Sequence, residues 1–126
     1  MLIVIDIGNT NITIGIYKDD KLIGNYRLTT KMKRTSDEYG FMILNFLSAS
    51  KASADDIKDV IISSVVPKIM HSFLNGIRKY MHKEPIVVGP GIRTGISVKA
   101  ENPKAVGADR IVDAAGAYYA VSYTHL

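Results

Sequence analysis

The chain has 126 residues and a formal net charge of +4, from 16 lysines and arginines against 12 aspartates and glutamates. With 47% hydrophobic and 22% charged residues, it has the composition of a globular domain with a core, and a disordered chain is excluded. It contains no cysteine, which excludes disulfides, thiolate metal sites and a cysteine nucleophile.

The first third of the sequence predicts three antiparallel strands joined by two tight turns. Leu2–Ile7 is an almost unbroken apolar run, as expected of a buried central strand. After the polar turn 8–11, isoleucines alternate with other residues at 12, 14 and 16. Asp19 and Asp20 mark the second turn, and residues 21–28 form the third strand.

From residue 35 the apolar residues recur at helical spacing. Thr35 followed by Glu38 is typical of a capping box, in which the side chain of each residue accepts a hydrogen bond from the backbone N–H of the other. Asp37 and Glu38 also place negative charge in the first turn, where the helix dipole favours it. The apolar stripe of this helix consists of Tyr39, Met42, Ile43, Phe46 and Leu47.

Strands and helices alternate in the rest of the chain. We expect a buried strand at 59–63, a helix that opens at Pro67, a strand at 86–88 and a last helical region from Pro103. Antiparallel neighbours at the start exclude a doubly wound Rossmann order. The pattern predicts an α/β fold with a mixed sheet and flanking helices.

The first polar turn has the composition of a phosphate-binding turn. Gly8 permits positive φ and close approach of the backbone, and exposed amides after it can surround phosphate oxygens. Ordinary hairpin chemistry explains the same residues. The position of Asp6 favours a site, because a carboxylate that closes an apolar strand needs a cation or hydrogen bonds. The candidate residues are Asp6, Ile7, Gly8, Asn9, Thr10, Asn11, Ile12 and Thr13, with Asp6 as a Mg²⁺ ligand, directly or through water.

A second candidate site lies at residues 107–110. Gly107 permits a tight approach, and Asp109 and Arg110 fall in or near the first turn of the last predicted helix. The helix dipole keeps an aspartate ionised there, and a guanidinium can bind a carboxylate by its two-pronged fork. From the residues alone, an ordinary helix start explains this pair better than a binding site.

The order and spacing of four segments resemble the type III pantothenate kinases of the actin-like ATPase superfamily. The segments are the Asp-x-Gly-Asn-Thr motif at 6–10, Arg27–Thr30, Ser63–Pro67 and Asn102–Arg110, and the resemblance covers residues 1–119. It implies a ribonuclease-H-like, actin-like ATPase fold. The implied reaction is ATP-dependent phosphorylation of pantothenate to 4′-phosphopantothenate, the first step towards coenzyme A.

The resemblance also implies roles for individual residues. Gly107, Ala108, Asp109 and Arg110 would bind pantothenate, and Asp109 would accept the proton of its hydroxyl. Residues 6–13 would hold the phosphates of ATP. Mg²⁺, a monovalent cation such as K⁺ or NH₄⁺ and a homodimer are further implications. Ala100 stands where the family commonly has a tyrosine that contacts pantothenate.

The same resemblance divides the chain into a matching part and a short tail. Residues 1–119 correspond to the N-terminal lobe with the start of the connecting helix, and residues 120–126 do not look like the family's continuation. The second lobe, with the other phosphate motif and the monovalent-cation site, has no residues here. We therefore expect the chain alone to bind ATP poorly and to show negligible kinase activity.

Other functions stay open at this point. The chain can be another small-molecule kinase or phosphatase of the superfamily, or a non-catalytic accessory or regulatory binding protein. Lys31, Lys33 and Arg34 form a basic cluster that is most simply a solvated loop, so we expect no nucleic-acid partner. The histidines lack metal-ligand spacing. No segment is long enough to span a membrane, and we expect a cytoplasmic protein.

Overall fold

The computed structural model describes residues 1–88, and the helical region expected from Pro103 lies outside them. The elements are β1 (Leu2–Ile7), β2 (Asn11–Lys18), β3 (Lys21–Thr29), α1 (Ser36–Ala49), a 3-10 turn (Ala54–Asp56), β4 (Asp59–Ser64), α2 (Pro67–Met81) and β5 (Ile86–Val88). Every element expected before residue 89 is confirmed. The 3-10 turn is an addition that the apolar pattern does not reveal.

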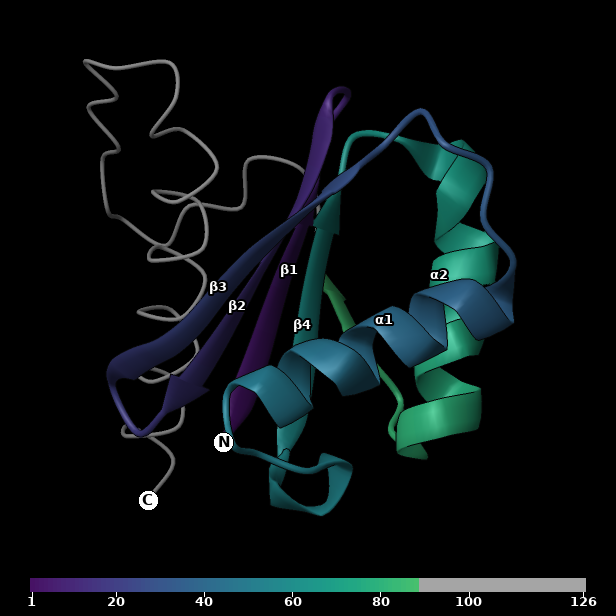
Figure 1. Ribbon diagram of the computed structural model, residues 1–126. Helices are drawn as coiled ribbons and strands as arrows, with labels where there is room; N and C mark the ends of the chain where they lie inside the picture. Colours follow the sequence, from purple (N-terminus) through teal and green to yellow (C-terminus); the bar gives the residue numbers. More distant parts are fainter. Residues whose placement is uncertain (89–126) are drawn as a thin grey trace, which may run out of the picture.

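The strands form one mixed sheet in the order β3-β2-β1-β4-β5. The two hairpins are antiparallel, whereas β1 pairs with β4 and β4 pairs with β5 in parallel. Helices α1 and α2 lie on the same side of this sheet (Figure 1). Within residues 1–88, neither helix is long and apolar enough to cross a membrane.

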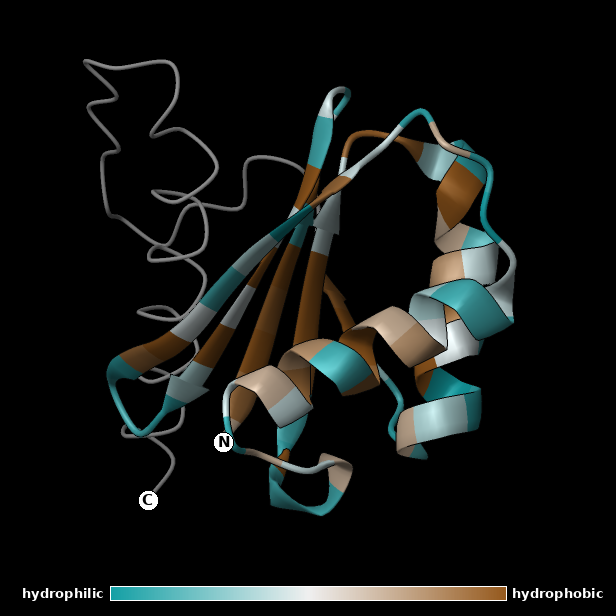
Figure 2. Ribbon diagram, viewed as in Figure 1, coloured by the Kyte–Doolittle hydropathy of each residue, from teal (hydrophilic) through white to brown (hydrophobic). Residues whose placement is uncertain are grey.

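Strand β1 lies at the centre of the sheet, and all six of its residues are buried. Ile3, Ile5 and Ile7 face the helices, whereas Leu2 and Val4 belong to a separate apolar cluster. Burial on both faces explains the unbroken apolar run. Figure 2 shows the same contrast, since β1 is hydrophobic along most of its length and β3, at the sheet edge, changes colour from residue to residue.

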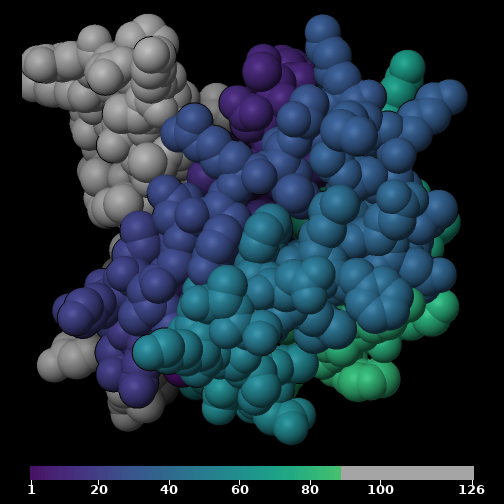
Figure 3. Space-filling model, viewed as in Figure 1, coloured from purple at the N-terminus to yellow at the C-terminus, as the bar shows by residue number. Residues whose placement is uncertain are grey.

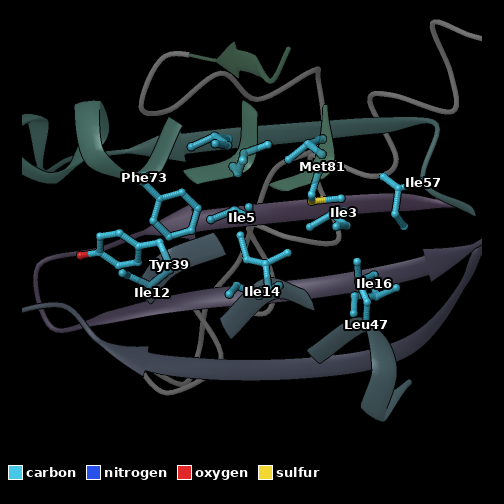
Figure 4. Close-up of a cluster of buried hydrophobic side chains, with 14 of the residues drawn as sticks. Ile3, Ile5, Ile12, Ile14, Ile16, Tyr39, Leu47, Ile57, Phe73 and Met81 are labelled. Carbon is cyan, nitrogen blue, oxygen red and sulfur yellow. The ribbon is translucent and has the colours of Figure 1, made fainter. Parts of the chain in front are cut away.

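The main core fills the space between the sheet and the two helices (Figure 4). Helix α1 contributes Tyr39, Ile43 and Leu47, and helix α2 contributes Phe73, Ile77 and Met81. The rings of Tyr39 and Phe73 are tilted, with centroids 4.8 Å apart. The isoleucines of β1 and β2 form the floor of this cluster, so the helical stripes predicted from the sequence are the buried faces.

The two helices approach each other closely at two glycines. A Cβ atom at Gly76 would lie 2.5 Å from the Ser36 carbonyl oxygen, and one at Gly40 would collide with the ring of Tyr80. Beside this contact, Asp37 accepts hydrogen bonds from Lys79 Nζ at 2.8 Å and from the Tyr80 hydroxyl at 2.7 Å. The start of α1 is therefore joined to the end of α2.

We expect Gly76→Ala to lower the free energy of unfolding by about 1–3 kcal/mol, because the added methyl forces the helices apart. Alanine is otherwise the better helix former, so the sign of the change isolates the contact. Asn45→Ala, at an exposed position of α1, is the control and should not destabilise the fold. Urea unfolding followed by circular dichroism measures both. A Gly76→Ala protein as stable as the unmodified chain would contradict the close helix contact.

The hydrogen bond from Lys79, followed by that from Tyr80, holds the pKa of Asp37 below its ordinary value. Such a carboxylate stabilises the fold above the ordinary carboxyl pKa of about 3.9, and this contribution is lost as the pH falls through the lower folded value. Lys79→Met should raise the Asp37 pKa in a carboxyl-detected NMR titration, while Lys58→Met should not. An unchanged Asp37 pKa in Lys79→Met would show that the ion pair does not form in solution.

Candidate functional site

The turn between β1 and β2 lies at one end of the sheet (Figure 1), and its residues 8–11 are glycine, asparagine and threonine. It is closed by the Gly8 N–H, which donates to the Asn11 carbonyl oxygen at 2.9 Å. Asn9, Thr10 and Asn11 are exposed. A Cβ atom at Gly8 would lie 3.2 Å from the Asn11 carbonyl oxygen, so close backbone approach explains the glycine without a positive φ. The predicted tight turn is confirmed.

Thr30, just after β3, holds this turn in place by two hydrogen bonds. Its N–H donates to the Thr10 carbonyl oxygen at 3.0 Å, and its hydroxyl donates to the Gly8 carbonyl oxygen at 2.8 Å. The side chain is buried. Figure 3 shows the atoms of the turn at the upper end of the molecule, beside those of the segment that follows β3. Thr30 is included in the Arg27–Thr30 segment of the sequence motifs, but no role is predicted for it from the sequence.

A row of polar side chains crosses the sheet next to the turn. In the strand register, Asp6 of β1 pairs with Thr13 of β2 and with Ser63 of β4, and Thr13 pairs in turn with Arg27 of β3. Paired residues share a face of the sheet. Because Ile5 and its odd-numbered neighbours face the helices, the row lies on the opposite face.

The row suits a hard cation or a phosphate. Asp6 and Thr13 are each 5% exposed, and a carboxylate so far from bulk water must be compensated by charge or hydrogen bonds. Oxygen donors are the ligands of Mg²⁺, which keeps several waters and is held by one or two carboxylates plus phosphate oxygens. No group of three or more potential metal-ligating side chains occurs among residues 1–88. These residues therefore fit Mg²⁺ only as part of a metal–phosphate complex.

The end of β4 is fastened to the end of β1. The Val65 N–H donates to the Ile7 carbonyl oxygen at 3.0 Å, and Ser64 Oγ accepts from the Val66 N–H at 2.9 Å. Pro67 then opens α2 at its first position, as predicted. The Ser63–Pro67 segment is thus held at the same end of the sheet as the polar turn.

The predicted site residues differ in burial, and some of them lie outside the described residues. Ile7 and Ile12 have side chains in the core, so only their backbone can face a ligand. Ser63 and Arg27 are included in the sequence motifs but not among the predicted site residues. Strand pairing brings Ser63 beside Asp6 and Arg27 beside Thr13. Residues 107–110, including Asp109, and Ala100 lie outside the described residues.

The chain is similar to known proteins over most of its length. A family model described as type III pantothenate kinase matches residues 2–126. A type III pantothenate kinase of Bifidobacterium longum subsp. infantis is 53% identical over 119 residues, covering 94% of this chain and 47% of the relative. One of Bifidobacterium adolescentis is 54% identical over 119 residues, covering 94% and 46%. The chain spans about half the length of the curated relatives it matches.

The fold is similar to that of a solved protein, the ROK hexokinase from Thermus thermophilus. The TM-score is 0.54 at 8% sequence identity, over 70% of this chain and 33% of that chain. At this identity the likeness shows the fold alone. Together with the family match, it confirms the predicted actin-like α/β fold with a mixed sheet and flanking helices.

We expect Thr30→Val to lower the free energy of unfolding by about 1 kcal/mol, because it removes the hydroxyl donor of the partly buried Gly8 carbonyl oxygen. Thr29→Val, at the exposed neighbouring position, is the matched control and should change stability little. Hydrogen exchange of the turn amides, measured alongside urea unfolding, should also speed up in Thr30→Val alone. Equal stability and equal exchange in the two variants would show that Thr30 does not hold the turn.

Proposed function

Because the chain belongs to the type III pantothenate kinase family, we propose that it forms the phosphate-binding part of an enzyme that phosphorylates pantothenate. ATP donates the phosphoryl group, and the products are ADP and 4′-phosphopantothenate, the first step of coenzyme A biosynthesis. The observation that carries the proposal is the buried Asp6 in register with Thr13 and Ser63, next to an exposed polar turn.

In this proposal residues 6–13 receive the phosphates of ATP. The backbone N–H groups of the exposed turn residues Asn9, Thr10 and Asn11 donate to phosphate oxygens, which is the usual way in which a tight turn binds an anion. Asp6 holds Mg²⁺, directly or through water, flanked by the hydroxyls of Thr13 and Ser63. The ion, when bound, neutralises charge on the phosphate oxygens.

The acceptor side of the proposal rests on residues 107–110. Gly107, Ala108, Asp109 and Arg110 bind pantothenate, and Arg110 offers the fork geometry that suits a carboxylate. Asp109 orients the substrate hydroxyl and accepts its proton. A carboxylate is a weak base at neutral pH, which is sufficient because phosphoryl transfer passes through a loose transition state that depends chiefly on positioning and charge.

We assign residues 1–119 to the N-terminal lobe of this enzyme. The other phosphate motif and the site for K⁺ or NH₄⁺ then belong to the half of the relatives that this chain does not span. We further propose that the enzyme is a cytoplasmic homodimer that acts on a small molecule. The polar row supports it by supplying an acid and hydroxyls at the sheet end where a phosphate chain can reach the turn.

A coupled ADP-release assay tests the proposal on this chain continued by the second half of the Bifidobacterium adolescentis relative. ADP release should depend on pantothenate, and the 126-residue chain alone should show negligible turnover. ADP release that does not need pantothenate would favour another kinase or a phosphatase. ATP binding without any turnover would favour an accessory binding protein.

In the same fusion protein, Asp109→Asn should lower kcat by about 10²- to 10⁴-fold, the range for a positioned acid–base group. Asp113→Asn removes a carboxylate four residues further along the predicted helix and is the matched control. Binding of pantothenate, measured by calorimetry, should persist in both variants. Near-normal turnover in Asp109→Asn would remove the proposed role of this residue.

A further inference from the structure

A cavity of 490 Å³ lies between the segment that follows β3 and the start of α2. It is lined by four cationic residues, Lys31, Lys33, Arg34 and Lys68, and by Tyr39. Tyr39 belongs to the core beneath the helices, whereas the Asp6 row lies on the other face of the sheet. This cationic cavity is therefore distinct from the polar row, although both lie at the same end of the sheet.

The positive charges of the cavity are not neutralised by neighbouring acids. The ion pairs recorded within residues 1–88 join Arg78 to Glu84 and Lys79 to Asp37, so the described carboxylates form none with the four cavity residues. Four like charges around one concave space repel each other unless an anion lies between them. The cavity therefore favours a negatively charged occupant.

Tyr39 supplies an independent indication of a ligand. It is 1% exposed, and its hydroxyl has no hydrogen-bond partner among the described residues. Its ring is fixed between Phe73, with centroids 4.8 Å apart, and the Arg34 guanidinium, 5.9 Å from the ring centre. Figure 4 shows the hydroxyl directed away from the other labelled side chains. A buried hydroxyl normally has a partner, so this donor lacks an acceptor that a ligand in the cavity can provide.

The surroundings of the cavity are already ordered for such a ligand. The Arg34 side chain donates to the Thr29 carbonyl oxygen at 2.6 Å and to Met32 Sδ at 3.6 Å, which holds the basic segment in place. Helix α2 begins at the cavity with no side-chain cap and no acid in its first turn. Its dipole thus adds positive potential to that of Lys68.

We propose that the cationic cavity binds the phosphate group of a small organic molecule. The phosphate oxygens accept a hydrogen bond from the Tyr39 hydroxyl and pair with the cavity lysines, and the apolar side chains of Met32, Val66 and Ile69 contact the organic part. The volume lies in the range of about 300–1,000 Å³ that is usual for small-molecule sites. Of the residues that line the cavity, Asn9 alone belongs to the turn proposed to receive ATP, and the inference rests on Tyr39 and the four cationic residues instead.

The test is a titration of the ¹⁵N-labelled 126-residue chain with phenyl phosphate at constant ionic strength, followed by amide NMR shifts. Saturable shifts should appear at residues 31–34 and 66–72. Tyr39→Phe keeps the ring and removes only the hydroxyl, and it should weaken binding about tenfold, as expected for a hydrogen bond to a charged group. Lys33→Gln should weaken binding several-fold, with a smaller dependence on salt.

Two controls accompany these variants. Tyr26→Phe removes a hydroxyl that is hydrogen-bonded to Ser50 Oγ away from the cavity, and Lys58→Gln removes an exposed charge elsewhere; neither should change the dissociation constant. The proposal is overturned if Tyr39→Phe and Lys33→Gln bind as tightly as the unmodified chain. Shifts confined to residues 6–13, or no saturation by about 10 mM, also overturn it. If inorganic phosphate binds as tightly as phenyl phosphate, the claim that the cavity contacts the organic part of the ligand is wrong.

Discussion

Strand β1 is hydrogen-bonded to β2 on one side and to β4 on the other, and the site depends on the register of these two pairings. Burial of Ile3, Ile5 and Ile7 against the helices fixes which residues point to the opposite face. A slip of one residue would bring Asp6 to the core side and an isoleucine to the polar row, at the cost of burying an uncompensated carboxylate. The hydrophobic core therefore positions a polar site that it does not contain.

The two sites that we propose lie at the end of the sheet near the first turn and have opposite character. On one face the buried Asp6 offers an acid to a cation, and on the other the cationic cavity offers lysines to an anion. Asn9 belongs to the turn and also lines the cavity, so the turn is the structural link between the two faces. Thr30 fastens this turn, so a change in the segment after β3 would reach both sites through the hydrogen bond to the Gly8 carbonyl oxygen.

Features encoded by neighbouring residues could be predicted from the sequence. The capping box is an example: the Thr35 N–H donates to Glu38 Oε1 at 2.9 Å, and the Glu38 N–H donates to Thr35 Oγ1 at 3.2 Å. Features that depend on distant segments could not. The parallel pairing of β1 with β4 brings Ser63 to Asp6. Lys31 and Lys33 are exposed, as the expected solvated loop would be, but α2 brings Lys68 beside them and makes a cavity.

The most direct test of the polar row is a crystal structure of the chain, continued by the second half of a relative, with Mn²⁺ and a non-hydrolysable ATP analogue. Mn²⁺ takes the oxygen ligands of Mg²⁺ and is located by its anomalous scattering. We expect a metal peak in direct or single-water contact with the Asp6 carboxylate, beside the hydroxyls of Thr13 and Ser63, and its loss in Asp6→Asn. A metal–nucleotide complex bound elsewhere, with the Asp6 carboxylate bonded only to protein groups, would contradict it.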